Sequence, residues 1–409
     1  MKASKLSLLL FLGSNLIANE NNASLDAYIS KYKQSEFEYD YQKNRAESLQ
    51  LRDSWIAPIK INYSLSRSKP YTKEQQNETA AIRIDQPIFQ SGGIYYGIKF
   101  AKMSRLYADY SIDVAKRKMI KDTVMLLMQI KQTELKEKKQ KLLIKNSEIN
   151  LAQKQEEYLN GQLDSGFLDN AIIQRNIVIQ TLYDIQTAKE KLLTQFHMLS
   201  DLDYKTARIP YLDYLTPDEF IQHNIVLKQR DAEIQKNRYA KNVRIAKYLP
   251  RVNITGGYNW SKSTGQQFYA GEKFFDNSNE LGYYDYGFRV NLPLDINTFR
   301  DIESAKVDYL KAQVLKKDKQ RELQALFKQV MHNIHNFDKK ITLSDENKKL
   351  YEKLLRDTKE LYAAGYKTQY DVDTLKNSLE IQNIDTKIYA IDKQLELLNL
   401  YEMYVNSGE

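Results

Sequence analysis

Histidines and carboxylates are the residues of this chain that could carry out chemistry, and their spacing argues against an enzyme. His332 and His335 lie three residues apart, without a Glu in the arrangement that zinc hydrolases use, so a solvated pair on a helix is expected. His197 and His223 are isolated. There is no glycine-rich phosphate loop, Ser-His-Asp order or nucleophile elbow. We expect no catalytic residue, no metal and no cofactor.

Other charged residues alternate with apolar ones between Leu249 and Leu294, and this period of two predicts a pair of β-strands. A loop with Gly, Asn and aromatic residues separates the two runs. The apolar set is Val252, Ile254, Gly256, Tyr258, Trp260, Tyr284, Tyr286, Phe288, Val290 and Leu292. The polar set is Arg251, Asn253, Thr255, Asn259, Ser261, Asp285, Gly287, Arg289 and Asn291.

A second hairpin of the same kind is predicted over residues 56–89, where Arg83 and Asp85 alternate with Ile82 and Ile84. Two interpretations fit both hairpins. An antiparallel hairpin of a soluble protein rests its apolar face on a core. A membrane hairpin turns its apolar face to lipid and its polar face to water.

The composition predicts long helices, and the N-terminal segment predicts export of the protein. The chain has 409 residues, no Cys and few Gly and Pro, so its long segments rich in Lys, Gln, Glu and Leu predict coiled coil, without disulfides or thiolate metal sites. Lys2 and Lys5, followed by an apolar run to Leu12, predict a signal peptide over residues 1–18, with Ala23 as a second cleavage position. The net charge of +8 fits Lys-rich helix surfaces, and we expect no nucleic-acid partner.

The remaining pattern is an internal repeat, in which Ile56-Ala57-Pro58 matches Tyr248-Leu249-Pro250. The first repeat is predicted over residues 19–205, with a helix, the hairpin 56–89, a long helix 92–159 and a helix 167–200. A linker follows over residues 206–217. The second repeat, 218–409, contains a helix 218–248, a hairpin 250–294, a long helix 297–362 and a helix 369–405. Two short helices end to end equal one long helix, roughly 100 Å at 1.5 Å per residue.

Four strands do not close a barrel, and an open sheet in lipid leaves edge N–H and C=O groups unpaired. Strands from further copies would close it, and three copies supply twelve, which leaves room for water inside. The predicted fold is mainly α: a long antiparallel coiled-coil bundle with a small transmembrane β part, four strands per chain completing a twelve-stranded barrel in a trimer. The charged residues expected in the barrel lumen are Arg83, Asp85, Arg251, Asp285 and Arg289.

With these elements in this order, the chain resembles the TolC-like outer-membrane efflux factors. The matching segments are Gln86-Pro87-Ile88-Phe89, Tyr248-Leu249-Pro250-Arg251-Val252 and Tyr362-Ala363-Ala364-Gly365 followed by Tyr370-Asp371-Val372. The resemblance implies a homotrimer in outer-membrane lipid with a periplasmic helical extension. It also implies docking to a periplasmic adaptor and an inner-membrane pump, and export of small toxic molecules or polypeptides.

The resemblance also implies a gate at the two turns that end the helical bundle, which contain Gly161 and Gly365. Asp371 could form a ring of three carboxylates at a threefold axis, although an acid there also suits the first turn of a helix. Thr374 stands where the family commonly has a second acid, and Phe167 where the first turn usually has one. The candidate gate residues are Asp371, Asp373, Tyr362, Lys367, Asp164 and Asp169.

A different class of function is also consistent with the helical pattern. Hairpins that pack as soluble caps on a coiled coil would make a structural or adhesive protein of the cell envelope. A protein that needs detergent for its extraction from the envelope and that produces pore currents would be the duct rather than this alternative.

Overall fold

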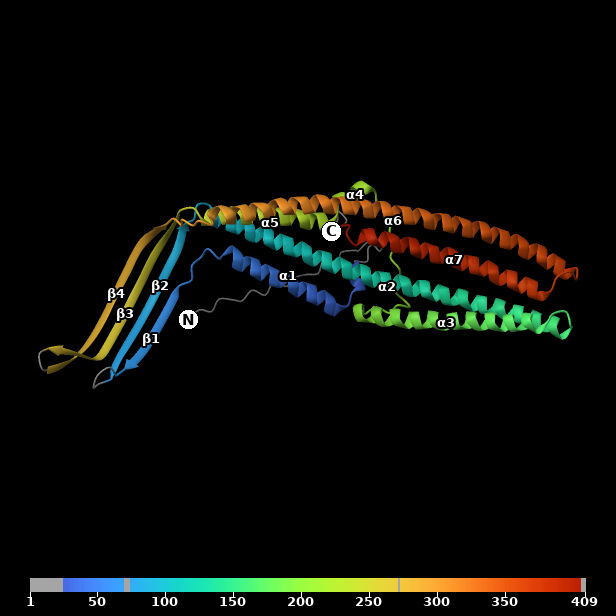
Figure 1. The fold of residues 1–409 in the computed structure, drawn as a ribbon, viewed down its shortest axis with the longest axis horizontal. Coiled ribbons are helices and arrows are strands. Elements are labelled where there is room, and N and C mark those ends of the chain that lie inside the picture. Colours follow the sequence, from blue (N-terminus) through green and yellow to red (C-terminus); the bar gives the residue numbers. More distant parts are fainter. Residues whose placement is uncertain (1–24, 70–73, 271–272, 406–409) are drawn as a thin grey trace, which may run out of the picture.

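The computed structural model describes residues 25–69, 74–270 and 273–405. It is an elongated molecule with strands at one end, helical turns at the other and helices along its whole length between them (Figure 1). The helices are η1 (Leu25–Tyr28), α1 (Lys31–Arg52), α2 (Gly93–Leu159), α3 (Ser165–Leu199), α4 (Pro217–Gln222), α5 (Ile225–Lys247), α6 (Thr298–Ala363) and α7 (Gln369–Tyr401). The predicted signal peptide lies outside the described residues.

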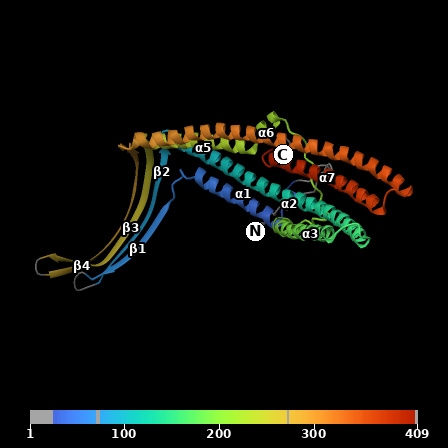
Figure 2. The same ribbon diagram turned by 45° about the vertical axis from the view of Figure 1, so that its right-hand side comes forward.

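The four strands are β1 (Lys60–Ser68), β2 (Gln75–Phe89), β3 (Arg251–Ala270) and β4 (Lys273–Asn291). They form one antiparallel sheet in the order β1-β2-β3-β4, so β1 and β4 are its edges. The sheet bends away from the helices as a curved ribbon (Figure 2). In its register Ile82 stands opposite Tyr258, and Tyr258 opposite Tyr284, so the apolar residues of three strands share one face.

Short helices complete the length of the long ones, as the repeat predicts. The pair α1 and α3 lies end to end beside α2, and α5 and α7 lie end to end beside α6 (Figure 1). The 67 residues of α2 correspond to about 100 Å of helix. The larger of two apolar cores packs α2 against α6 and α7 around Val124, Met128, Phe327, Val330 and Leu397. The fold class predicted for one chain is confirmed.

The helix predicted over 218–248 is in fact two helices, α4 and α5, separated by His223 and Asn224. Asn224 is fully buried, and its side chain accepts hydrogen bonds from the N–H groups of Val226 and Leu227, which starts α5 anew. The same residue forms a β-bridge with Tyr404, so α7 ends at Tyr401 rather than at residue 405. The helix start at Asn224 accounts for the first difference, and the bridge to Tyr404 for the second.

The described part of the chain contains no helix with the length and hydropathy needed to cross a bilayer.

Candidate functional site

The apolar face of the sheet is open to its surroundings in one chain. Ile61 is 75% exposed, and Tyr286 and Phe288 are 83% and 77% exposed, which is far more than a face packed on a core allows. No helix covers this face in either view of the ribbon (Figures 1 and 2). A contiguous exposed apolar patch of this kind marks a surface for lipid or for a protein partner.

The opposite face carries a polar network that crosses three strands. Asp85 on β2 accepts a hydrogen bond from Asn253 Nδ2 at 2.6 Å and forms an ion pair with Arg289 Nη1 at 3.2 Å. One step along the strands, Asn259 bridges two charged residues. Its Oδ1 accepts from Arg83 Nη2 at 3.2 Å and its Nδ2 donates to Asp285 Oδ1 at 2.9 Å.

Gly257 makes room for this network. A Cβ at Gly257 would lie 2.9 Å from the Oδ1 of Asp285, so a larger residue would push that carboxylate aside. Four of the predicted polar residues, Arg83, Asp85, Asp285 and Arg289, are thus brought together on one face. Arg251 shares their strand face but lies at the junction with the helices, beside the last turn of α5.

At the other end of the molecule, the two predicted turns close with the same hydrogen bonds. Gly161 and Gly365 have φ of 70° and 82°, where L side chains are strained. The N–H after each glycine donates back five residues: Gln162 to the carbonyl of Glu157 at 2.9 Å, and Tyr366 to that of Leu361 at 2.8 Å. This is the Schellman ending, and both turns have it.

Three of the six candidate gate residues start or brace a helix in one chain. Asp371 forms a capping box with Thr368, whose N–H donates to Asp371 Oδ2 at 3.0 Å, and these hydrogen bonds lower the pKa of Asp371. Lys367 Nζ lies 3.8 Å from the same carboxylate. Asp164 caps α3 through the N–H of Gly166.

The other candidates have less defined surroundings. Asp373 accepts a hydrogen bond from Gln369 Nε2 at 3.0 Å, and Tyr362 is 45% exposed. Asp169 is exposed near the start of α3. A single chain therefore brings Lys367, Asp371 and Thr368 together but does not join them to Asp164 or Asp169.

The sequence interpretation missed a polar seam, which we define as the pairs Gln132–Asp392, Lys139–Asp385, Asn146–Asn377 and Glu156–Tyr370 between α2 and α7. Lys139 Nζ contacts both oxygens of Asp385, at 2.7 and 3.0 Å. Asn377 donates to Asn146 at 2.8 Å, and the Tyr370 hydroxyl donates to Glu156 at 2.8 Å. Gln132 donates to Asp392, whose pKa is raised by burial. The first three pairs recur at every seventh residue of α2, so a heptad count that allowed polar layers could have found them.

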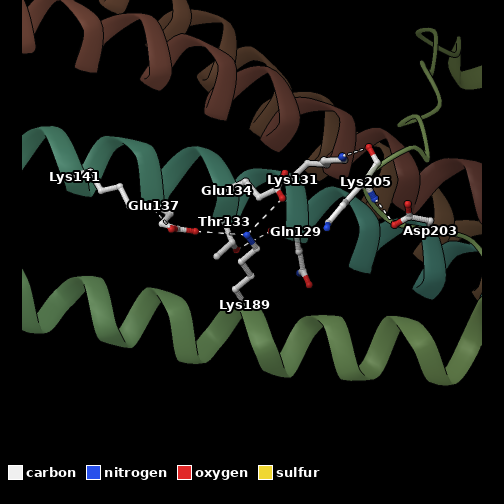
Figure 3. Close-up of polar contacts among 9 residues, drawn as sticks. All are labelled: Gln129, Lys131, Thr133, Glu134, Glu137, Lys141, Lys189, Asp203 and Lys205. Carbon is white, nitrogen blue, oxygen red and sulfur yellow. Dashed lines mark hydrogen bonds and ion pairs between the residues drawn. The ribbon is translucent and has the colours of Figure 1, made fainter.

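The coil formed by α2 and α3 is joined by apolar contacts, by a forked ion pair and by a hydrogen bond from Gln140 Nε2 on α2 to the carbonyl of Val178 on α3 at 2.7 Å. Phe196 is fully buried against Leu127 and Ile130. Lys189 on α3 lies 3.5 Å from both Glu134 and Glu137 on α2 (Figure 3). Nearby, Lys131 donates to the carbonyl of Lys205 at 3.2 Å and ties the linker to the same coil. The α2–α7 contact, for its part, is polar at regular intervals along the half of the bundle that leads to the turns.

His332 and His335 are both exposed on α6, and the described residues contain no cluster of three or more His, Cys, Asp or Glu side chains placed to hold a metal.

The chain is similar to known outer membrane proteins in both sequence and structure. Residues 216–403 match the family model described as outer membrane efflux protein. No curated protein matched the chain. Among solved structures, the outer membrane protein VceC of Vibrio cholerae is 13% identical with a TM-score of 0.71, covering 93% of this chain and 95% of its own. The CmeC outer membrane channel of Campylobacter jejuni is 13% identical with a TM-score of 0.70, over 96% of this chain and 87% of its own.

A third similar structure is the open state of the MtrE outer membrane channel of Neisseria gonorrhoeae, which is 12% identical with a TM-score of 0.61, covering 92% of this chain and 86% of its own. The members of this family are channels rather than enzymes. Residues 216–403 thus match the outer membrane efflux protein family, and the chain as a whole has the fold of these outer membrane channels.

Proposed function

We propose that three copies of the chain close their sheets into one barrel of twelve strands around a water path. The observation that carries this proposal is the sheet itself: two free edges, an exposed apolar face and a polar network on the other face. In lipid, each unpaired edge group costs several kcal/mol, and pairing β1 of one copy with β4 of the next removes both edges. The polar network then lines the lumen, and Tyr286 and Phe288 meet lipid.

The envelope adhesin, the alternative function, does not account for this face. A soluble cap would bury Tyr286 and Phe288 against its own core, and both are more than three-quarters exposed. The polar network would then have no water path to serve. The exposed face therefore favours the duct.

We place the gate of this duct at the turns, and the opening motion along the polar seam. Hydrogen bonds and ion pairs that water can reach contribute about 1 kcal/mol each to stability. Separating two helices along a polar contact therefore costs less free energy than separating them along an apolar contact of equal length. The α6–α7 coil can then swing from α2 while each coil stays intact. Three copies of Asp371 near the axis would attract cations and hold them at the closed tip.

The partners follow from the same architecture. A duct that ends in the periplasm needs a periplasmic adaptor and an inner-membrane pump to load it, and we propose that this chain works with both. Small toxic molecules or polypeptides are its cargo, and neither a cofactor nor nucleic acid takes part.

Insertion of two arginine variants into planar bilayers tests the proposed barrel. Phe288→Arg places a charge on the apolar face, where arginine at the bilayer midplane costs about 2–4 kcal/mol. Gly287→Arg is the matched control, because it places the same charge one residue away on the polar face, where a Cβ meets only Thr255 Oγ1, at 3.7 Å. We expect Phe288→Arg to lose insertion, and Gly287→Arg to insert and carry an altered current. Equal behaviour of the two variants, or a wild-type protein that stays soluble without detergent, would contradict the barrel.

A further inference from the structure

Four cations lie on the strands at the end of the sheet that joins the helices (Figure 1). Lys60 begins β1, Arg251 begins β3, and Arg289 lies near the end of β4. Arg83 on β2 stands directly opposite Lys60 in the register of the sheet. We call these four residues the cation belt.

All members of the cation belt are on the face that carries the polar network. Lys60, Arg83 and Gly257 stand in one row across the sheet, and Arg251 follows six residues along β3 from that row. Arg289 is paired with Asn253, which lies between the two. Since side chains alternate along a strand, even spacings keep all of these residues on one face. The belt therefore covers about 20 Å along the strand, at 3.4 Å per residue.

Cations outnumber carboxylates in this part of the face. Asp85 and Asp285 are the two carboxylates within the same rows, so four cations leave a net charge of +2 per chain, or +6 for three copies. Further from the helices, the described residues of this face are uncharged, as far as Ser66 on β1, Asn77 on β2, Ser263 on β3 and Asn279 on β4. The excess of positive charge is thus confined to the end of the sheet beside the helices.

Most of the cation belt lacks a partner of opposite charge. Arg289 forms an ion pair with Asp85 at 3.2 Å. Within the ranges that the structure describes, Lys60, Arg83 and Arg251 form no ion pair, and all three are exposed. Like charges directly opposite each other on antiparallel strands destabilise a sheet, and Lys60 faces Arg83 in this way. An anion beside the two side chains would relieve their repulsion.

We infer that the cation belt is an anion-selective ring in the barrel lumen, and that the open duct passes small inorganic anions in preference to cations. The inference rests on the proposed barrel, which brings three copies of the belt around one water path. A passage lined by one sign of charge concentrates ions of the opposite sign. Because the rest of the described lumen face is uncharged, no opposing ring of carboxylates follows the belt along the strands.

The reversal potential across a gradient of KCl measures this preference in planar bilayers. Asp371→Asn is the reference protein, because it lacks the carboxylates that we propose hold cations at the tip. We expect the reference channel to favour chloride over potassium. The preference should weaken as the salt concentration rises, because the screening length falls from about 10 Å at 0.1 M to about 3 Å at 1 M.

Charge changes in the belt should shift the preference in both directions. In the reference protein, Lys60→Gln with Arg83→Gln removes two charges per chain, cancels the excess and should abolish the preference for chloride. Asp285→Asn removes a carboxylate from the same row and should strengthen the preference. Lys262→Gln is the control, because Lys262 pairs with Glu280 on the apolar face of the sheet, and its loss should not shift the reversal potential.

A reference channel that favours potassium would overturn the selectivity of the belt. An unchanged preference for chloride in the double variant would do the same, and so would an equal shift in the Lys262→Gln control. Asp285→Asn decides the question where the double variant does not insert, and an unchanged or weaker preference for chloride in Asp285→Asn would overturn the inference. Wild-type protein that carries no current would overturn the duct itself, and its anion selectivity with it.

Discussion

The ion pair between Lys139 and Asp385 gives the sharpest test of the polar seam. Asp385→Asn keeps the shape of the side chain and removes its charge. The Asp385 side chain is 13% exposed and that of Lys139 is 32% exposed, so the pair is only partly screened by solvent. Hydrogen bonds to charged groups contribute about 1.5–3 kcal/mol, and exposure of the lysine favours the lower end of that range.

A loss of about 1.5 kcal/mol shifts the closed–open equilibrium of one seam roughly tenfold. If three seams open together in a trimer, the shifts add to about 4.5 kcal/mol, or roughly a thousandfold. Open probability in planar bilayers measures this quantity directly. We expect Asp385→Asn to convert a mostly closed channel into one with frequent openings.

Two controls separate the seam from general destabilisation. Lys319→Ala removes an ion pair formed within α6, to Glu322, and should leave gating unchanged. The double variant Lys139→Met with Asp385→Leu replaces the pair by apolar side chains and should restore much of the closed state. An open probability that does not change in Asp385→Asn, with no coupling between positions 139 and 385 in the double-mutant cycle, would show that the seam does not hold the channel closed.

Four further predictions concern three carboxylates of the bundle, Asp371, Asp392 and Asp164. Asp371→Asn should weaken the block of single-channel current by divalent cations, and unchanged block would remove its proposed role in the gate. Because hydrogen bonds from Thr368 lower the pKa of Asp371, its stabilising effect holds above the ordinary value of 3.8 and is lost as pH falls through the lowered pKa. Hydrogen exchange at the start of α7 should therefore quicken in acid for the wild type and show no such step for Asp371→Asn. Burial raises the pKa of Asp392, so its ionised form opposes folding, and Asp392→Asn should raise the denaturant midpoint at pH 7 while keeping the contact with Gln132; a lower midpoint would contradict this. Asp164→Ala removes the cap of α3 and should cost about 1 kcal/mol in chemical denaturation, and no loss would show that the cap is dispensable.

The strands and long helices were predictable because each obeys one strong period. Tyr284, Tyr286 and Phe288 alternate with charged and small residues, and the register places them together as the pattern requires. Gly161 and Gly365 marked the turns, since only glycine adopts their φ without strain.

The helix break at Asn224 and the polar seam were not predictable in the same way. A buried Asn that starts a new helix has the same sequence signal as a polar residue on a continuous helix surface. Gln132 and Lys139 likewise resemble solvated residues, and only the antiparallel approach of α7 brings Asp392 and Asp385 to them. The roles of Asp164 and Asp371 show the same ambiguity, because capping is visible in one chain and a gate needs three.

The proposed water-filled duct opens at its periplasmic end by separation of α2 from α7. The chain has no cysteine, so Asn146→Cys with Asn377→Cys introduces a unique pair at the side chains now joined at 2.8 Å. The measurement is single-channel current from this variant after a short reducible crosslinker has bridged the two thiols. We expect a current that stays at the closed level until a reductant is added and then rises to that of the unbridged variant. Normal opening with the bridge intact, or no current before and after its reduction, would contradict it.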